Sequence, residues 1–396
     1  MAGQHIPIMQ KTEYTDNMRK VCKEIDLQDN PALYIADAID NGRLTSDELK
    51  ALIADDHNLL DAATVNYLVS NKIISEHELE EECGIAHGFV DMLGMPITEM
   101  IDVEGSIQQI EEGTLEVYLW GIPSSGKTCA LGTILCAAKN NRNIVLSVEP
   151  VANSAHDFGY ESKLESIFTN NGDFCVLPGR TPVKTNFAIG LQLEDLKHKI
   201  HPVTLVDMAG ELFCYLQWLP AGSHDKYDER HQDALGSLNR ILVSNPSDNR
   251  KIHIFIIEYG AERKAYKGTL QDQYLTTGLT YLKNSGVLQN HTDGIYVLVT
   301  KTDKVAHNLK EGEYEMDHIM DFINRNYSNF MGLLDRCCRD FNINGGVLPP
   351  PFMFDIGDVC FKNFCQMDTS QASEVVSKIL LAERKGKCWL KRIFKR

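Results

Sequence analysis

The hydrophobic pattern divides the chain into two parts. Up to about residue 95, apolar residues recur at helical spacing, which predicts a small all-α N-terminal module. From residue 115 onward, short apolar runs alternate with helical stretches, which is typical of a mostly parallel sheet with helices on both faces. The expected strands are Leu115–Trp120, Ile144–Val148, Phe187–Leu193, Pro202–Val206, Ile252–Ile257, Ile295–Val299 and Pro351–Phe354. The expected organisation is a helical module (1–95), a linker (96–114), an α/β domain (115–383) and a basic tail (384–396).

The helical part contains an internal repeat. Residues 36–49 (ADAIDNGRLTSDEL) align with residues 66–79 (NYLVSNKIISEHEL). In each copy a helix is expected to end near an asparagine, and a capping box opens the next helix. The asparagines are Asn41 and Asn71, and the boxes pair Thr45 with Glu48 and Ser75 with Glu78. Two helical hairpins are therefore predicted, serving either as a structural bundle or as an adaptor that binds a partner or gates the next domain.

Composition narrows the class of protein. The chain has 396 residues, of which 43% are hydrophobic and 24% charged, as in a soluble globular protein. The net charge of −16 disfavours binding to nucleic acid. The sequence has no apolar run long enough to span a membrane and no secretory signal at its start. Its eleven cysteines include no C-x-x-C pair, which favours reduced thiols and a cytoplasmic location.

One local motif carries specific chemistry. Between an expected strand and an expected helix, the residues Gly121, Ile122, Pro123, Ser124, Ser125, Gly126, Lys127 and Thr128 match the phosphate-loop pattern G-x-x-x-x-G-K-[ST]. The glycines allow backbone N–H groups to point at a phosphate, and the helix N-terminus adds partial positive charge. Lys127 would reach the β- and γ-phosphates and contribute to catalysis, and the Thr128 hydroxyl would bind Mg²⁺.

Three further motifs bear on the cofactor and the base. Asp207, at the end of an expected strand, opens a D-x-x-G in which Asp207 could hold Mg²⁺ through water and the Gly210 amide could sense the γ-phosphate. Thr300–Asp303 (TKTD) is a variant of N-K-x-D. There the Asp303 carboxylate could accept two hydrogen bonds from guanine, which adenine cannot offer. Lys301 would lay its aliphatic stem over the ring. In the D-I-G-D turn, the amides of Ile356 and Gly357 could meet the guanine O6 atom.

On the motifs GIPSSGKT, DMAG and TKTD, the sequence resembles the Ras-like and translation-factor class of P-loop GTPases. The resemblance covers about residues 115–383. Within this class, the sequence is similar to bacterial GTPase-like proteins. The resemblance implies a GTPase-type P-loop fold, GTP and GDP as ligands and Mg²⁺ as cofactor.

The chain departs from that class in several places. Glu211 follows D-x-x-G where many members carry the residue that orients the attacking water, so slow hydrolysis is expected. Thr300 replaces an asparagine, which loses an amide bridge to the phosphate loop. An insertion of roughly 147–186 contains the expected first switch, whose threonine for Mg²⁺ and the γ-phosphate is Thr185, with Thr181 as the alternative. Arg180 is either a solvated loop charge or an arginine that acts on the phosphates.

The sequence thus predicts a Mg²⁺-dependent GTP-binding switch that hydrolyses GTP slowly. The alternatives are an ATP-dependent P-loop enzyme and a nucleotide-binding scaffold with little turnover. An unidentified protein partner would bind the helical module or the switch regions. The tail (384–396) holds seven basic residues and no acid, and its apolar residues recur at helical spacing. It predicts either peripheral contact with the inner face of a membrane or a tail that packs on the domain or lies disordered.

Overall fold

The structure, a computed structural model, describes most of the chain, and the chain divides into two compact units. The described residues are 14–25, 27–96, 110–151, 157–168, 172–179, 186–208, 210, 212, 216, 236, 239, 240, 242, 248–266, 268–309 and 313–393, with the backbone alone at 306–308 and 383–393. The N-terminal unit comprises residues 1–98, 174–177 and 358–366. The sheet unit comprises residues 99–173, 178–357 and 367–396.

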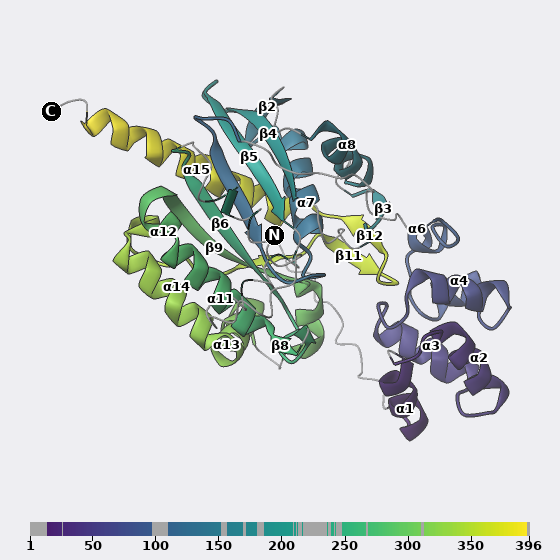
Figure 1. Ribbon diagram of the computed structural model, residues 1–396. Helices are drawn as coiled ribbons and strands as arrows, with labels where there is room; N and C mark the ends of the chain where they lie inside the picture. Colours follow the sequence, from purple (N-terminus) through teal and green to yellow (C-terminus); the bar gives the residue numbers. More distant parts are fainter. Residues whose placement is uncertain are drawn as a thin grey trace. The chain divides into compact units, whose positions relative to one another are not determined.

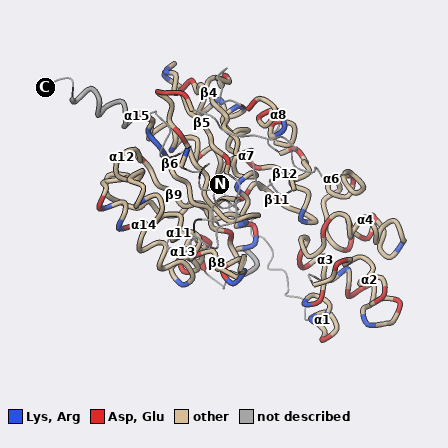
Figure 2. Tube along the Cα trace, in the orientation of Figure 1, with Lys and Arg blue, Asp and Glu red and all other residues tan. Residues whose placement is uncertain are grey.

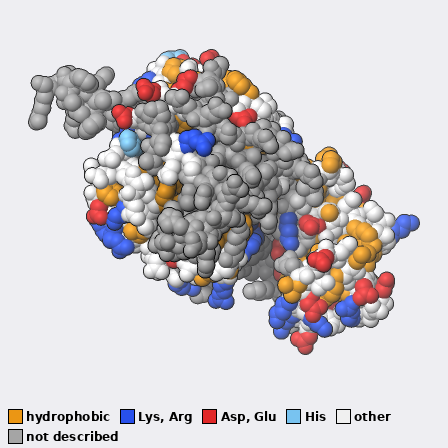
Figure 3. Space-filling model, viewed as in Figure 1, with side chains coloured by type: hydrophobic (Ala, Val, Ile, Leu, Met, Phe, Trp, Pro, Cys, Tyr) orange, Lys and Arg blue, Asp and Glu red, His pale blue; other side chains and the backbone are white. Residues whose placement is uncertain are grey.

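Helices account for the regular structure of residues 14–96. They are α1 (Asp16–Ile25), α2 (Pro31–Asp40), α3 (Ser46–Asp55), α4 (Ala62–Ser70), α5 (Glu76–Glu81) and α6 (His87–Val90). Four of them begin at a side chain that accepts a hydrogen bond from a backbone N–H of the first turn, namely Asn30, Thr45, Asp61 and Ser75. Their apolar faces share one buried core. On the face shown in Figure 3, charged and hydrophobic side chains intermingle over this unit.

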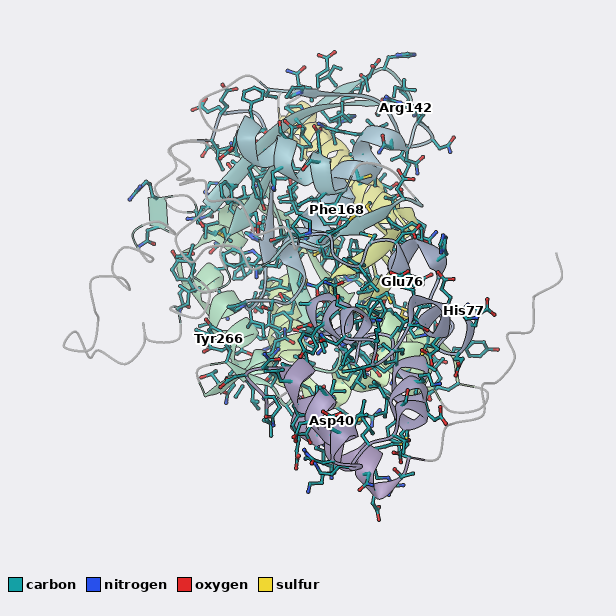
Figure 4. All side chains as sticks on the ribbon, turned by 90° about the vertical axis from the view of Figure 1, so that its right-hand side faces the viewer. Asp40, Glu76, His77, Arg142, Phe168 and Tyr266 are labelled. Carbon is teal, nitrogen blue, oxygen red and sulfur yellow. The ribbon has the colours of Figure 1, made fainter. Side chains whose placement is uncertain are left out.

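The repeat predicted from the sequence is a structural repeat. Helices α2 and α4 both end at an asparagine cap, Asn41 and Asn71, and both capping boxes form. In Figure 4, Asp40 marks the end of α2, and Glu76 lies in α5, the helix that follows the second cap. The predicted asparagine helix ends and capping boxes are therefore confirmed. They were predictable because each involves residues only a few positions apart.

The N-terminal unit also contains a three-stranded sheet from distant parts of the chain. Its strands are β3 (Phe174–Val176), β11 (Gly357–Cys360) and β12 (Phe364–Met367), in the order β11-β12-β3. Phe361 and Phe364 are buried in the helical core. Asn58 Nδ2 donates to Val359 O at 2.8 Å, and Lys362 N donates to Asn58 Oδ1 at 2.9 Å. The unit is therefore not purely helical, and segments that the sequence assigned to the α/β domain belong to it, because their aromatic side chains are buried among these helices.

The sheet unit is built on a seven-stranded, mostly parallel sheet, as predicted. Its strands are β1 (Leu115–Trp120), β2 (Val145–Pro150), β4 (Asn186–Asp195), β5 (Ile200–Met208), β6 (Lys251–Glu258), β9 (Thr292–Thr300) and β10 (Phe352–Phe354). The strand order is β10-β9-β6-β1-β5-β4-β2. Neighbours from β10 to β5 are parallel, whereas β4 is antiparallel to β5 and to β2. Figure 2 shows that β6 and β9 are mostly uncharged, with charges along helices and turns.

Helices cover both faces of this sheet (Figure 1). Alternate residues of β1 point to opposite faces. Tyr118 and Trp120 join the core with Leu275 and Phe330, which lie in α11 (Gln271–Asn284) and α14 (Ser328–Asp340). Helices α7 (Lys127–Asn140) and α15 (Ser370–Ile393) pack against each other. Helix α7 also contacts β1, β2 and β5, and α15 contacts β9 and β10. The remaining elements are α8 (Phe158–Ile167), α12 (Val287–His291), α13 (Glu315–Asn326), the 3₁₀ helices η3 (Thr302–Asn308) and η4 (Ile343–Gly345), and the short strands β7 (Ala265–Tyr266) and β8 (Thr269–Leu270).

The basic segment at the C-terminus continues a helix rather than starting a separate element. Helix α15 runs without interruption from Ser370 to Ile393. Within the described part of the chain, no helix combines the length and the apolar character needed to cross a membrane.

Candidate nucleotide-binding site

The loop Gly121–Thr128 joins β1 to α7 at the carboxyl end of the central strand. Ser124 and Gly126 have φ angles of 64° and 86°, in the left-handed region, and Gly126 is the N-cap of α7. A Cβ atom at Gly121 would lie 2.7 Å from Ser125 Oγ and 3.3 Å from the Ile256 backbone oxygen. Glycine is therefore favoured at position 121 by close approach and at position 126 by backbone conformation.

Lys127 reaches back across this loop. Its Nζ atom donates to Gly121 O and to Ile122 O, at 2.8 Å each, and the residue is buried. Ser125 Oγ donates to Ile122 O at 2.9 Å and tightens the same turn. The two carbonyls that Lys127 contacts are neutral, so they hold the ammonium group in place without cancelling its charge.

Asp207, at the end of β5, lies beside the first turn of α7. Thr128 Oγ1 donates to Asp207 Oδ2 at 3.2 Å, and Tyr160 Oη donates to the same oxygen at 2.5 Å. The other carboxylate oxygen, Asp207 Oδ1, is buried and has no hydrogen-bond partner among the described residues. Burial raises the pKa of Asp207, and the hydrogen bond from Tyr160 and the charge of Lys127 oppose that rise. One oxygen of this carboxylate is thus held by two hydrogen bonds, whereas the other is buried without a partner among the described residues.

Gly210 packs directly on the phosphate-type loop. A Cβ atom at this position would lie 2.5 Å from Pro123 N, 2.7 Å from Ile122 C and 2.8 Å from Lys127 Nζ. No side chain fits there without displacing the loop backbone, so glycine is required. The structure therefore brings Asp207 and Gly210 together with Gly121–Thr128, although they are far apart in sequence.

Thr300, at the end of β9, connects the loop to the adjacent TKTD segment. Its hydroxyl donates to Ser125 O at 2.8 Å and is also 3.4 Å from Ile257 O. The sequence indicated that threonine at this position would lose the amide bridge to the loop. A hydroxyl bridge takes its place, because β9 ends close enough to the loop for the shorter side chain to reach.

The rest of the TKTD segment turns sharply after β9. Lys301 has a φ angle of 60°, and its Nζ atom contacts Glu258 Oε1 at 2.5 Å. Asp303 is half-buried, and burial, reinforced by the charge of Asp355, raises its pKa. A carboxylate in this setting gains from a ligand that donates hydrogen bonds to it.

The D-I-G-D turn lies next to Asp303 but keeps one of its amides occupied. Gly357 has a φ angle of 114°, and its N–H donates to Asp355 Oδ1 at 3.3 Å. Gln371 Nε2 donates to Asp355 Oδ2 at 2.9 Å, and Thr302 Oγ1 donates to it at 3.4 Å. To meet a base oxygen, as the sequence predicted, the Gly357 amide would have to leave this acceptor. At Ile356, the other residue predicted to meet the base, the carbonyl oxygen accepts a hydrogen bond from Asp368 N at 2.9 Å.

Four residues of the predicted site lie outside the part of the chain that the structure describes, and the structure adds one group that was not predicted. Glu211, Thr185, Thr181 and Arg180 lie outside the described residues. The added group is Tyr160, which no local signal in the sequence selects. It lies in α8, within the insertion that precedes the expected strand at Phe187, and only the fold brings it to Asp207.

Comparison of the chain with protein-family models and with curated protein sequences finds no match.

Proposed function

We propose that this protein binds a guanine nucleotide with Mg²⁺ at the carboxyl end of β1 and acts as a slow GTPase switch. The observation that carries the proposal is the convergence of Lys127, the pair Thr128 and Asp207, and Gly210 on one loop. Each residue type has a role in phosphate or cation binding, and their convergence is not required by the sheet itself.

The phosphates would lie against the amides of Gly121–Thr128, at the N-terminus of α7. Lys127, already held over the loop by two carbonyls, would meet the β- and γ-phosphates. No group of three or more His, Cys, Asp or Glu side chains suited to a metal gathers among the described residues. Mg²⁺ usually binds through one or two protein groups, phosphate oxygens and water, and Thr128 and Asp207 fit that donor set.

When bound, Mg²⁺ would neutralise charge that develops on the phosphates. Lys127 and the loop amides would stabilise the same charge during in-line attack by water. Thr185 and Glu211 are the remaining candidates for contacts with the γ-phosphate and the water. Because Glu211 would add negative charge there, we expect turnover well below the typical enzyme value of about 10 s⁻¹. Undetectable turnover in a single-turnover assay would favour the alternative of a nucleotide-binding scaffold.

Selectivity for guanine would come from Asp303. Its carboxylate is half-buried, and burial raises its pKa, so donors from a base would offset the cost of its charge. Asp303→Asn should weaken GTP binding and relax selectivity toward xanthine nucleotides, because one acceptor becomes a donor. Competition between GTP and ATP for the unmodified protein tests the idea, and tighter binding of ATP would support the alternative of an ATP-dependent enzyme.

Chain connectivity supports a role for the N-terminal unit in reading the nucleotide state. The chain leaves β3 at Val176, shortly before the expected switch threonines, and enters β11 from the D-I-G-D turn. A conformational change in either loop would be passed along the chain to β3 or β11, and the N-terminal unit would then change the surface that it offers to a protein partner. The basic end of α15 is a candidate for peripheral membrane contact in a cytoplasmic protein, which co-sedimentation of the full chain and a chain ending at Glu383 with anionic vesicles would test.

A further inference from the structure

Tyr160 is a buried side chain beside the candidate site that the proposed mechanism leaves without a role. It is 0% exposed, and its hydroxyl donates to Asp207 Oδ2 at 2.5 Å. Its ring stacks on Phe187 of β4, with centroids 4.0 Å apart and planes 10° apart. A carboxylate oxygen only accepts hydrogen bonds, so the Tyr160 hydroxyl is the donor in this contact.

The position of Tyr160 is fixed by the docking of α8 on α7. The Nζ atom of Lys139 in α7 donates a hydrogen bond to Glu161 Oε1 in α8 at 2.5 Å and also contacts the Glu165 carboxylate. At Gly132 of α7, a Cβ atom would lie 2.2 Å from the ring of Phe168, so the glycine allows the ring to pack on the helix backbone. Figure 4 labels Phe168 in the sheet unit. Since α7 also carries Lys127 and Thr128, the contact ties the phenol to the same helix as the candidate ligands.

This arrangement makes the two oxygens of Asp207 unequal. Oδ2 accepts from Tyr160 and Thr128, whereas the buried Oδ1 has no partner among the described residues. A carboxylate held through one oxygen has a defined orientation for the other. Hydrogen bonds of this kind to a metal-binding carboxylate raise metal affinity, because they reduce the reorganisation that binding requires.

We propose that Tyr160 is a positioning residue for the divalent cation: its hydroxyl orients Asp207 so that Oδ1 meets Mg²⁺ or a water bound to it. The proposal rests on the nucleotide and Mg²⁺ binding proposed above and adds a residue to that site. It also gives the insertion a function, since α8 supplies the group that orders the cation site.

The test compares two variants that make the same chemical change. Tyr160→Phe removes the hydroxyl and keeps the ring. Tyr118→Phe is the matched control, because Tyr118 is also 0% exposed and also donates to a buried carboxylate, Glu116 Oε2 at 2.7 Å. For each full-length protein, the affinity for a fluorescent GDP is measured in EDTA and across a range of free Mg²⁺, and folding is verified by thermal unfolding.

The midpoint is the free Mg²⁺ concentration at which the Mg²⁺-dependent change in GDP affinity is half complete. Tyr160→Phe should raise this midpoint by about 10- to 100-fold. The affinity measured in EDTA should stay unchanged, and so should the midpoint for Tyr118→Phe. Phe187→Leu, which keeps the phenol but removes the stacked ring, should shift the midpoint in the same direction by a smaller factor.

An unshifted midpoint for Tyr160→Phe, or equal shifts for Tyr160→Phe and Tyr118→Phe, would overturn the role of Tyr160 while leaving the nucleotide site in place. If Tyr160→Phe does not fold, an unchanged midpoint for Phe187→Leu would overturn it. Nucleotide binding by the unmodified protein that does not depend on Mg²⁺ would overturn both this role and the proposed cation site. Failure of the unmodified protein to bind GDP would instead contradict the proposed function itself.

Discussion

The central strands carry one buried polar cluster around Glu116 at their amino ends and another around Asp207 and Glu258 at their carboxyl ends, and these two clusters differ in how completely they are satisfied. At the amino end, Glu116 Oε2 accepts from Tyr118 at 2.7 Å and pairs with Lys251 at 3.0 Å, while Oε1 accepts from Asn249 at 2.8 Å. At the carboxyl end, Asp207 Oδ1 and Glu258 Oε2 are buried with no hydrogen-bond partner among the described residues.

The difference separates a structural cluster from a candidate ligand site. A closed network of buried charges holds strands together and leaves no group for a ligand. A buried carboxylate that keeps an oxygen unpaired has an energetic cost, and such groups gather where a ligand supplies the missing partner. The same strand, β1, contributes Glu116 to the closed end and leads into Gly121 at the open end.

The largest expected effect comes from breaking the closed network. Glu116→Gln leaves the Lys251 ammonium, which is 1% exposed, without its carboxylate. We expect the free energy of unfolding to fall by about 3–5 kcal/mol, as for a buried ion pair that loses one partner. Urea denaturation measures this loss. Combining Glu116→Gln with Lys251→Met should recover much of it, because the ammonium is gone and the amide oxygen still accepts a hydrogen bond from Tyr118 or Asn249. A loss that persists in this double variant would argue against the pairing as its cause.

A second effect concerns His253, which lies in β6. Trp120 Nε1 donates to His253 Nδ1 at 3.0 Å, and an indole N–H can only donate, so Nδ1 is unprotonated and the ring is neutral. Burial, together with the charge of Lys251, lowers the pKa of His253 from 6.5 to about 3. Between these values the unfolded chain binds the extra proton, so stability is fully present above pH 6.5 and declines as the pH falls.

This histidine should contribute a loss of about 2 kcal/mol in the free energy of unfolding between pH 7 and pH 5. Denaturation curves for the unmodified protein and for His253→Gln isolate that contribution, because His253→Gln cannot take up the proton. Equal pH dependence in the two proteins would show that His253 is not held neutral in the folded state.

The smallest effect on stability is expected at the open end. Asp207→Asn keeps an oxygen for Tyr160 and Thr128 but removes a charge that burial disfavours. Without nucleotide and Mg²⁺, its free energy of unfolding should be unchanged or higher by up to about 1 kcal/mol. The same variant should require far more Mg²⁺ for nucleotide binding. Destabilisation as large as that of Glu116→Gln would mean that the two ends play the same structural role.

The sequence predicted what local signals encode. Apolar runs such as Ile252–Ile257 predicted the strands, and the spacing of Gly121, Gly126 and Lys127 predicted the loop that connects β1 to α7. The capping boxes were predictable because each is complete within four residues.

Long-range contacts were not predictable in this way. The joining of β12 to the N-terminal helices depends on contacts such as Ala62 N with Asn363 Oδ1, and no periodicity relates these positions. Tyr160, the single tyrosine of residues 147–186, could not be selected because no local signal shows whether its hydroxyl meets a distant carboxylate such as Asp207 or its ring only packs. Glu116 lies inside an apolar run, where the pattern predicted a strand but gave no partner for the charge.

Calorimetric titration of GDP, GTP and ATP in Mg²⁺, into the unmodified protein and into Lys127→Ala, tests the assignment of the open end as a nucleotide site most directly. Lys127 lies across the loop and would be the closest positive charge to the phosphates. The unmodified protein should bind GDP and GTP at one site and more tightly than ATP, and Lys127→Ala should lose most of this binding while remaining folded. Absence of nucleotide binding by the unmodified protein, or equal binding by Lys127→Ala, would contradict the account.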